Sequence, residues 1–571
     1  MFISNEKLKK ILITAGIIDE KTWEDAVKNA QRLEMPIEDI LKERDIIAGH
    51  YLYELVSQAI RLPYVNLKRI DVDEKALLMV DTETVGKHKA IPYKIDQKKK
   101  LLHVAFLDPT DTQSIKTLEK KTKYKIIPAF MGQSSYKFAS RSYQKGVADS
   151  IKKLIERLAK GTGAKKNGWF LTSLFEKLFE FVYYTQPSDI HIEHLEHNGV
   201  IKFRIDGFLR DEFFIPNTII TAIGHLIKQE ARMKTDHLHQ ARDGRFSKMV
   251  FNEMLSFRVS TLPTYYGEKI CLRVLDESRQ KTSLRDLGFR EQDIEAVKKE
   301  TKRPFGLILV TGPTGSGKSS TLYTLLKSLN VEGISIATIE DPIEYSVKHI
   351  NQTQVNLETG FTFAQGLRAI LRQDPNIIMV GEIRDTETGV ITIQSALTGH
   401  IVLSTLHSNT AAGAITRLRN MDVRSYLLAS TLNLIISQRL VKGICPYCRE
   451  SYPLDAQLLE TMSKDAGLDM QALLAKLKNR GHLSFETLED IRFYRGKGCG
   501  RCKGKGLLGR VGIFEILNVN EEIKQMILAE KGELQIQKAV VDKGMLTLFE
   551  DGLLKVFQGE TTIEEIMRIL N

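Results

Sequence analysis

The sequence has no long hydrophobic stretch and only five cysteines among its 571 residues. No apolar run approaches the roughly 20 residues that a helix needs to span a bilayer. The first ten residues are polar and no long apolar segment follows, so we expect no signal peptide and a cytoplasmic chain. Five cysteines do not imply a disulfide framework. The chain also has no aromatic-rich basic groove of the kind that binds single-stranded nucleic acid.

Length and charge set broad limits on the fold and the partners. A chain of this length is too long for one core, and we expect three or four domains. The net charge of +11 is compatible with nucleic acid, an acidic lipid or an acidic partner. The lysines are scattered, however, and occur only in short runs such as 98–100. A solvated basic surface is the interpretation that we favour.

The most informative segment reads GPTGSGKSS and fits the P-loop pattern G-x-x-x-x-G-K-[ST]. The apolar run 305–311 before it predicts a buried parallel strand, and 319–329 predicts a helix. Glycines allow successive backbone N–H groups to point at phosphate, and the helix N-terminus adds positive charge. A plain Gly/Ser turn would explain neither the pattern nor its setting. The predicted nucleotide-binding residues are Gly312, Pro313, Thr314, Gly315, Ser316, Gly317, Lys318, Ser319 and Ser320. Lys318 would neutralise the β- and γ-phosphates of ATP and Ser319 would hold Mg²⁺.

Carboxylates and histidines follow the next predicted strands. The strand 336–339 precedes Asp341 and Glu344, at the sheet edge where parallel sheets bind ligands. The strand 377–380 ends in Gly381-Glu382, and a carboxylate at this Walker B position can orient or deprotonate a water molecule. His400 and His407 flank the strand 401–405. A lone histidine is usually structural, but two around one such strand favour phosphate sensing.

Four of the cysteines form two C-x₂-C pairs, Cys445 with Cys448 and Cys499 with Cys502. Two such knuckles supply four thiolates for a tetrahedral metal, and Zn²⁺ is the favoured ion. Glycines surround the second pair, as tight knuckle turns require. The gap between the pairs is longer than in the usual zinc ribbon. Redox-active or idle thiols remain as alternatives.

Taken together, these motifs resemble those of the secretion ATPase family, the type II secretion and type IV pilus assembly ATPases. Residues 338–345 (TIEDPIEY) are similar to the family's Asp box, 371–388 to its Walker B signature, and 398–409 to its His box. The resemblance extends over nearly the whole chain. It implies a RecA-like α/β core, preceded by a PAS-like α/β domain and an N-terminal helical and α+β domain, with a zinc module near the C-terminus.

The same resemblance extends to segments before the core, namely 187–193, 204–207, 243–247 and 257–275. In this family, arginines at such positions approach the nucleotide from outside the core, where a guanidinium can pair with phosphate oxygens. Arg258 and Arg273 are the candidates that the resemblance implies, and Arg245 is a weaker one. Without the resemblance, surface salt bridges would be the preferred interpretation of these arginines.

Composition and resemblance together predict the domain boundaries. We expect a helical-repeat and α/β docking domain over 1–145, a linker over 146–168 and a second α/β domain over 169–287. The ATPase domain would cover 288–571, with the metal module at about 440–515. Within the first 60 residues, a weak repeat predicts two successive helix–turn–helix copies. Relatives with such repeats can bind cyclic di-GMP, but the glycine of their Arg-Leu-Gly signature is absent here, which favours docking to a partner.

The resemblance implies a homohexamer that hydrolyses ATP and drives assembly of a pilus or pseudopilus through an inner-membrane platform protein. The expected location is the cytoplasmic face of that membrane, reached through partners. A nucleic-acid motor with a RecA-like core is the rival hypothesis, and DNA-stimulated hydrolysis would support it. A non-catalytic scaffold is a third, opposed by the intact Lys318, Ser319 and Glu382. The sequence does not separate pilus assembly from type II secretion.

Overall fold

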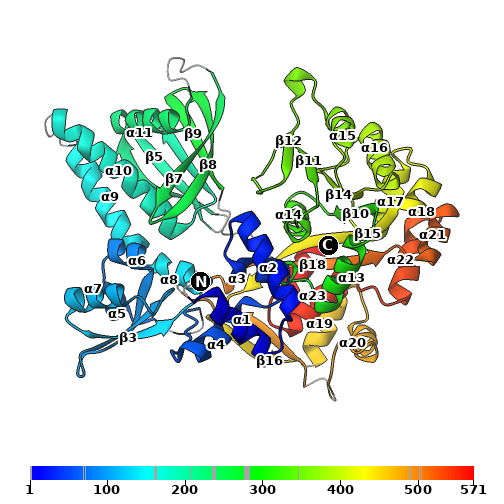
Figure 1. The fold of residues 1–571 in the computed structure, drawn as a ribbon, viewed down its shortest axis with the longest axis horizontal. Coiled ribbons are helices and arrows are strands. Elements are labelled where there is room, and N and C mark those ends of the chain that lie inside the picture. The colour runs from blue at the N-terminus through cyan, green and yellow to red at the C-terminus, as the bar shows by residue number, and fades with distance from the viewer. Residues whose placement is uncertain are drawn as a thin grey trace. The chain divides into compact units, whose positions relative to one another are not determined.

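The computed structural model describes most of the chain, which forms two compact units (Figure 1). The described residues are 3–68, 70, 72–159, 164–205, 208–233, 240–275, 283–344, 346–454, 456–485, 487, 490–499, 502 and 504–570. One unit contains Met1–Ala15 and Gly49–Arg279, and the other contains Gly16–Ala48 and Gln280–Asn571. Residues 206–207, which belong to a motif quoted above, lie outside the described residues.

The N-terminal repeat is confirmed as two pairs of helices, α1 (Asn5–Thr14) with α2 (Glu20–Leu33) and α3 (Ile37–Glu43) with α4 (Gly49–Ile60). Asp19 caps α2 by accepting a hydrogen bond from the Thr22 N–H, as N-cap aspartates do. The two outer helices contact each other and belong to the first unit, whereas α2 and α3 belong to the second. The repeat is therefore divided between the units.

A small α/β layer follows in the first unit. Its three-stranded sheet has the order β1 (Ala90–Asp96), β2 (Leu101–Phe106), β3 (Lys125–Phe130), with β1 antiparallel and β3 parallel to β2. The helices around it are α5 (Glu74–Leu78), α6 (Thr82–His88), α7 (Thr112–Thr122) and α8 (Gln133–Ser140). Val104 and Phe106 are fully buried between sheet and helices, which explains the alternation of short apolar strands with helices in this sequence.

The span predicted as a linker, 146–168, is largely helical. Helix α9 (Gln144–Ala159) buries Val147, Ile151 and Ile155 in the hydrophobic core of the unit, and α10 (Ala164–Thr185) runs beside it. The buried residues recur every three to four positions, which is the spacing of one helix face. The Gly-rich composition that predicted a linker is concentrated in residues 160–168, of which 160–163 lie outside the described residues.

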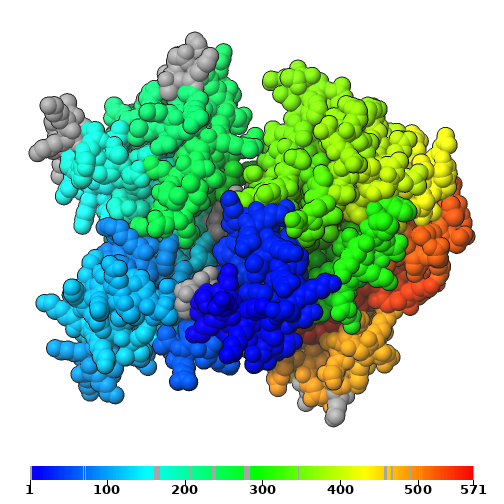
Figure 2. Space-filling model, in the orientation of Figure 1, coloured from blue at the N-terminus to red at the C-terminus, as the bar shows by residue number. Residues whose placement is uncertain are grey.

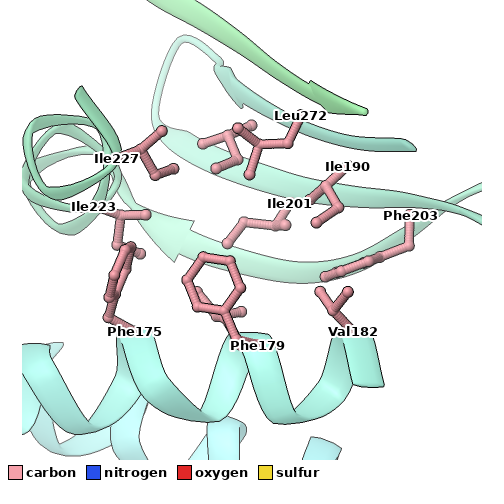
Figure 3. A pocket seen from close by; sticks show the side chains of 11 residues that line it. Phe175, Phe179, Val182, Ile190, Ile201, Phe203, Ile223, Ile227 and Leu272 are labelled. Carbon is pink, nitrogen blue, oxygen red and sulfur yellow. The ribbon is translucent and has the colours of Figure 1, made fainter. Parts of the chain in front are cut away.

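A six-stranded antiparallel sheet with helices on one face completes the first unit. Its order is β6 (Phe208–Pro216), β5 (Asn198–Ile205), β4 (Asp189–His194), β9 (Gly267–Leu275), β8 (Glu253–Thr264), β7 (Arg242–Val250). Helices α10 and α11 (Asn217–Glu230) cover one face, where Phe179, Ile201 and Leu272 meet around a small apolar cavity (Figure 3). Because side chains alternate along a strand, the residues between these apolar ones point to the opposite face.

The second unit is built on a seven-stranded sheet with strand order β12-β11-β13-β14-β10-β15-β18 (Figure 1). The strands are β10 (Gly306–Thr311), β11 (Ile336–Glu340), β12 (Asn351–Gln354), β13 (Ile377–Val380), β14 (Ile401–Leu406), β15 (Leu432–Ile444) and β18 (Leu507–Asn518). All neighbours are parallel except β15 and β18. The strands predicted at 305–311, 336–339, 377–380 and 401–405 are confirmed. This order, with the P-loop strand between β14 and β15, is the RecA-like arrangement.

Helices cover both faces of this sheet, and each face has its own buried cluster. They are α12 (Leu284–Leu287), α13 (Glu291–Thr301), α14 (Lys318–Leu329), α15 (Phe363–Leu371), α16 (Thr386–Leu397), α17 (Ala411–Arg419), α18 (Ser425–Thr431), α21 (Glu521–Leu528), α22 (Glu533–Asp542), α23 (Leu548–Phe557) and α24 (Ile563–Leu570). Strands such as β10 are buried at every position, as expected for a parallel sheet covered on both sides.

Helices α2 and α3 join this unit through polar contacts that the sequence did not reveal. Arg32 donates to the Oδ1 of Asn330 at 2.9 Å, just beyond the end of α14, and Lys348 pairs with Glu34 at 2.7 Å. The carboxylate of Asp45 accepts from the N–H of Leu284 at 3.0 Å, at the start of α12. These contacts explain why residues 16–48 belong to the second unit.

The metal module contains a two-stranded sheet of its own. Strands β16 (Arg449–Pro453) and β17 (Arg492–Gly496) form an antiparallel pair. Between them lie α19 (Ala456–Ala466) and α20 (Met470–Asn479), within the long gap that separates the two cysteine pairs. Met470, Leu474 and Leu477 of α20 are buried in the same cluster as Phe493 of β17. The unusual spacing thus corresponds to an inserted helical pair whose buried side chains share one cluster with β15, β18 and α23.

Candidate active site and metal centre

The P-loop follows β10 and leads into α14, as predicted. Gly315 and Gly317 have φ of 81° and 91°, in the left-handed region that favours glycine. At Gly312 a Cβ would lie 2.5 Å from the carbonyl oxygen of Gln438, so only glycine fits there. Helix α14 has no side-chain cap at Gly317, and its first N–H groups are available to an anion. The loop therefore fits a nucleotide phosphate chain.

Lys318 lies at the start of α14 with its ammonium folded onto the loop. Its Nζ donates to the carbonyl oxygens of Gly312 and Pro313 at 2.9 and 3.0 Å. Burial lowers the pKa of Lys318, while the nearby carboxylate of Glu382 raises it and does not fully compensate. Ser319 is exposed one residue further along the helix, on the solvent side of the loop. Both side chains are placed to reach a phosphate or its metal.

The turn after β13 is held against β14 by three hydrogen bonds. The hydroxyl of Ser404 donates to Val380 O at 2.8 Å, and that of Thr405 donates to Gly381 O at 2.7 Å. The N–H of Ile383 returns a bond to Thr405 O at 3.0 Å. Polar residues inside an otherwise apolar strand thus fix the backbone on both sides of Glu382.

Glu382 extends from this turn into a group of charged side chains. Its carboxylate forms an ion pair with Arg384, and its Oε2 lies 3.6 Å from Nε2 of His407. Burial lowers the pKa of His407, and the nearby Lys318 lowers it further. His407 is therefore neutral at neutral pH. The structure brings the predicted Lys318, Glu382 and His407 together at the carboxyl edge of the sheet.

His400 is separated from this group. It precedes β14, whereas His407 follows it, so the two lie at opposite edges of the sheet. They are separated by the six residues of β14, each of which advances an extended chain by about 3.3 Å. The Nδ1 of His400 lies 2.9 Å from Ser395 O, near the end of α16. His400 and His407 therefore do not lie around one phosphate site, contrary to the expectation from the sequence.

The end of β11 supplies three further carboxylates. Asp341 is exposed, and its Oδ2 lies 3.5 Å from Nη1 of Arg384, while Glu344 is exposed on the following loop. Glu340, which the sequence argument passed over, is 3% exposed. It accepts hydrogen bonds from Thr338 Oγ1 at 2.6 Å and Gln352 Nε2 at 3.1 Å, and from the Tyr323 hydroxyl.

This buried carboxylate lies beside the Walker B turn. Gly381 N donates to Ile339 O at 2.8 Å, and a Cβ on Gly381 would lie 3.3 Å from Cα of Glu340. A carboxylate at this depth needs partners to remain in place, and Glu340 has three. Its position one residue before Asp341, at the tip of a buried strand, was the signal available in the sequence. Glu340 joins Glu382 as a candidate for positioning water or metal.

The predicted arginines form a row across the open face of the six-stranded sheet. Arg258 is opposite Arg245 on β7 and opposite Arg273 on β9, and Arg273 is opposite Asp189 on β4. The Nε of Arg273 donates to Asp189 Oδ1 at 3.2 Å, and Arg258 Nη2 lies 3.7 Å from Asp243 Oδ1. These ion pairs agree with the alternative interpretation, in which the arginines form surface salt bridges. The row of arginines nevertheless concentrates positive charge on one face of the sheet. Its role at the nucleotide stays a prediction.

The four predicted cysteine ligands converge. Their sulfur atoms all lie within 4.8 Å of one another, with Cys445 to Cys499 at 3.9 Å and Cys448 to Cys502 at 3.8 Å. A tetrahedron with Zn–S bonds of about 2.3 Å has edges of about 3.8 Å. These separations therefore fit a Cys₄ zinc site and are far longer than the roughly 2.05 Å of a disulfide bond.

Backbone N–H groups support the same cluster. The N–H groups of Cys499 and Gly506 donate to the sulfur of Cys502 at 3.1 and 3.2 Å. Burial raises the pKa of the Cys502 thiol, but these donors and the neighbouring thiols lower it to about 7. A Cβ at Gly496 would lie 2.0 Å from Gly506 O, so the two knuckle strands can approach only because both residues are glycine. The donor set and its surroundings fit Zn²⁺.

The RecA-like sheet, the glycine loop and the Walker B carboxylate define a P-loop ATPase. Comparison with known proteins is more specific. The sequence profile of the type II/IV secretion system protein family matches residues 164–568, and that of the MshEN domain matches residues 60–138. The chain belongs to the type II/IV secretion system protein family.

Individual relatives cover much of the chain. The type IV pilus assembly ATPase PilB of Myxococcus xanthus is 33% identical over 98% of this chain and 98% of its own length. The type II secretion system ATPase E of Vibrio cholerae is 42% identical over 67% of this chain and 72% of its own length. Among solved structures, the pilus retraction motor PilT with bound ADP is 28% identical, with a TM-score of 0.48, over 69% of this chain and 96% of PilT.

Proposed function

We propose that this chain is a hexameric ATPase that powers assembly of a type IV pilus or a type II secretion pseudopilus. The observation that carries the proposal is the convergence of Lys318, Glu382 and His407 at one sheet edge, in a chain that matches a pilus assembly ATPase over nearly its full length. The type II secretion relative from Vibrio cholerae matches about two thirds of the chain, 67% of it. The domain boundaries given above are part of this proposal, except that most of the predicted linker over 146–168 belongs to α9 and α10.

Hydrolysis of ATP supplies the free energy, and Mg²⁺ would offset negative charge on the phosphates. Residues Gly312 to Ser320 would bind the phosphates through backbone N–H groups, Lys318 would pair with them, and Ser319 would bind the metal. Glu382 would orient the attacking water and accept its proton, with Asp341, Glu344 and the buried Glu340 as further carboxylates at the same edge. His407 would sense the phosphate indirectly, through its contact with the carboxylate of Glu382.

Arg258 and Arg273 would complete the site from the six-stranded sheet. A guanidinium that meets the phosphates only when the nucleotide is in place stabilises developing charge. Hydrolysis would then move this domain relative to the core, which is an ordinary kind of motion for nucleotide switches. In a ring, that motion would pass to a platform protein at the cytoplasmic face of the inner membrane. No nucleic acid is required in this cycle.

Zn²⁺ would have a structural role. With four thiolates around it there is no open coordination position for a substrate, so the ion would hold the two knuckles together. Cys445 directly follows β15, and Cys502 lies shortly before β18. These two strands pair along their length. The zinc module would therefore fasten the end of the central sheet.

The proposal is tested on the purified full-length chain by its mass and its ATP turnover. We expect a hexamer in the presence of ATP and Mg²⁺, with turnover that rises on addition of the platform protein's cytoplasmic domain and not on addition of DNA. A monomer with strong DNA stimulation would favour a nucleic-acid motor instead. The genes beside this one separate the two machines, because a pilin with a retraction ATPase indicates a pilus and a secretin with pseudopilins indicates secretion.

A further inference from the structure

One of the two tryptophans of the chain is unusually exposed. Trp23 of α2 is 5% exposed and belongs to a core, whereas Trp169 near the start of α10 is 66% exposed. Trp169 packs edge-on against Phe170, with ring centroids 5.1 Å apart, and Arg157 of α9 lies 6.0 Å from the Phe170 ring. Trp169 and Phe170 together with Arg157 form an aromatic and cationic cluster rather than a single scattered apolar side chain.

Helix α9, which packs beside α10, carries exposed basic residues. Lys152 and Lys153 are exposed on the outer side of α9, and Arg157 follows one turn later. Glu156 is the acidic residue among them. Helix α9 as a whole has four lysine or arginine residues and two acidic ones. In Figure 2, α9 and α10 belong to the cyan part of the surface.

An exposed tryptophan among lysines matches the interface of an anionic bilayer. The indole ring is apolar with one polar N–H, and tryptophan is enriched at the level of the lipid headgroups. Each lysine near an anionic surface strengthens binding about fivefold. A protein partner would more commonly place the tryptophan in a largely apolar patch with few lysines, because lysine is depleted in protein interfaces.

We propose that the end of the α9–α10 hairpin formed by Lys152, Lys153, Arg157, Trp169 and Phe170 is a docking surface for anionic lipid. The tryptophan would insert at headgroup level and the cations would pair with lipid phosphates. None of the described helices is both long and apolar enough to cross a membrane, so this contact would be peripheral. The proposed function places the chain at a membrane through partners, and this surface would give it a direct contact.

The test uses the full-length chain and vesicles of phosphatidylcholine with or without phosphatidylglycerol. We expect co-sedimentation with the anionic vesicles that is lost at high salt and absent with phosphatidylcholine alone. In a Trp23→Phe background, the emission of Trp169 should shift to shorter wavelength on binding. Trp169→Ala and the pair Lys152→Ala with Lys153→Ala should each weaken partitioning, the pair by about 25-fold at about fivefold per lysine.

A matched charge control is available in the turn between β1 and β2. Lys98 and Lys99 are also adjacent exposed lysines, but the nearby exposed residues are not aromatic. Replacing both with alanine should leave vesicle binding nearly unchanged. Lys318→Ala, which removes turnover under the proposed function, should bind vesicles like the wild type, so failure of one proposal does not imply failure of the other.

Three results would overturn the inference. The first is equal binding to neutral vesicles, and the second is vesicle binding that survives Trp169→Ala without any emission shift in the Trp23→Phe protein. The third is absence of vesicle binding together with binding of a DNA oligonucleotide or a protein domain that Trp169→Ala removes. The co-sedimentation of the unsubstituted chain keeps the test valid if Trp23→Phe does not fold.

Discussion

The Oε2 of Glu382 lies 3.6 Å from Nε2 of His407, across the ends of the adjacent strands β13 and β14. Arg384 pairs with the other oxygen of the same carboxylate. The Walker B glutamate is therefore held on two sides, by a permanent cation and by a histidine whose pKa burial keeps low. A change at the nucleotide phosphates that moves the Lys318 ammonium would alter the balance of charges around this carboxylate.

Replacing Glu382 with glutamine should preserve ATP binding and remove hydrolysis. The amide keeps the shape of the side chain but cannot accept a proton, and loss of a catalytic base typically costs about 10²–10⁴-fold in rate. Nucleotide affinity and turnover should be measured on the same preparation. Glu340→Gln, at the buried neighbour, is the comparison. Loss of hydrolysis only in Glu340→Gln would transfer the role of base to that residue.

Lys318→Ala should abolish turnover while the chain stays folded. The ammonium is the point charge beside the transferring phosphate, and its two hydrogen bonds in the structure are to carbonyls of the loop itself. Lys299, exposed on α13, is a matched lysine-to-alanine control that should retain full turnover. Thermal melting should be the same for both variants. Hydrolysis near the wild-type rate in Lys318→Ala would remove the P-loop from the mechanism.

His407 and His400 should differ in their effect on the dependence of ATP turnover on pH at acidic pH. Burial places the pKa of His407 below the ordinary value of about 6.5, so it is neutral at pH 7 and protonates only as the pH falls below that value. Protonated His407 would attract the Glu382 carboxylate and slow hydrolysis. His407→Asn should therefore flatten turnover between about pH 5 and 7. His400→Asn, at the opposite sheet edge, should leave the profile unchanged. Identical profiles in wild type and His407→Asn would contradict this coupling.

Local patterns predicted the core of the fold well. The strand before the P-loop and the strands before Glu382 and His407 are mainly apolar and are buried at each position, because a parallel sheet covered on both faces buries every side chain. The cysteine pairs were equally informative, since four thiolates are costly to place together without a metal. Each of these signals is contained within a few consecutive residues.

Long-range contacts were not predictable in the same way. Arg32 and Asp45 look like ordinary surface charges in the sequence, yet they join α2 and α3 to the ATPase core through Asn330 and Leu284. Helix α9 was hidden by the Gly- and Lys-rich segment that follows it. Glu340 was passed over because its burial depends on three donors, and two of these, Tyr323 and Gln352, are far away in the sequence.

Metal analysis of the purified chain should find about one Zn²⁺ per chain. Chelation should lower the melting temperature and expose residues between the two knuckles to proteolysis. Cys499→Ser should have the same effect, whereas Cys271→Ser, the fifth cysteine, should retain zinc. A metal-free protein with four freely reactive thiols and unchanged melting would show that the cluster is not a zinc site.

Arg258→Ala and Arg273→Ala should each reduce turnover strongly with little loss of ATP affinity. The reason is that a guanidinium that acts on charge in transfer contributes to the transition state more than to the ground state. The ion pairs of these arginines with Asp243 and Asp189 lie at the surface of the sheet, and Asp189 also pairs with Arg204, so removal of either arginine should cost little stability. Lys269 projects from the same strand and face as Arg273 and pairs with Glu193, which makes Lys269→Ala the matched control for lost positive charge. Turnover that falls equally in all three variants would mean that the arginines act only through the surface charge of the domain, and the proposed closure over the nucleotide would be wrong.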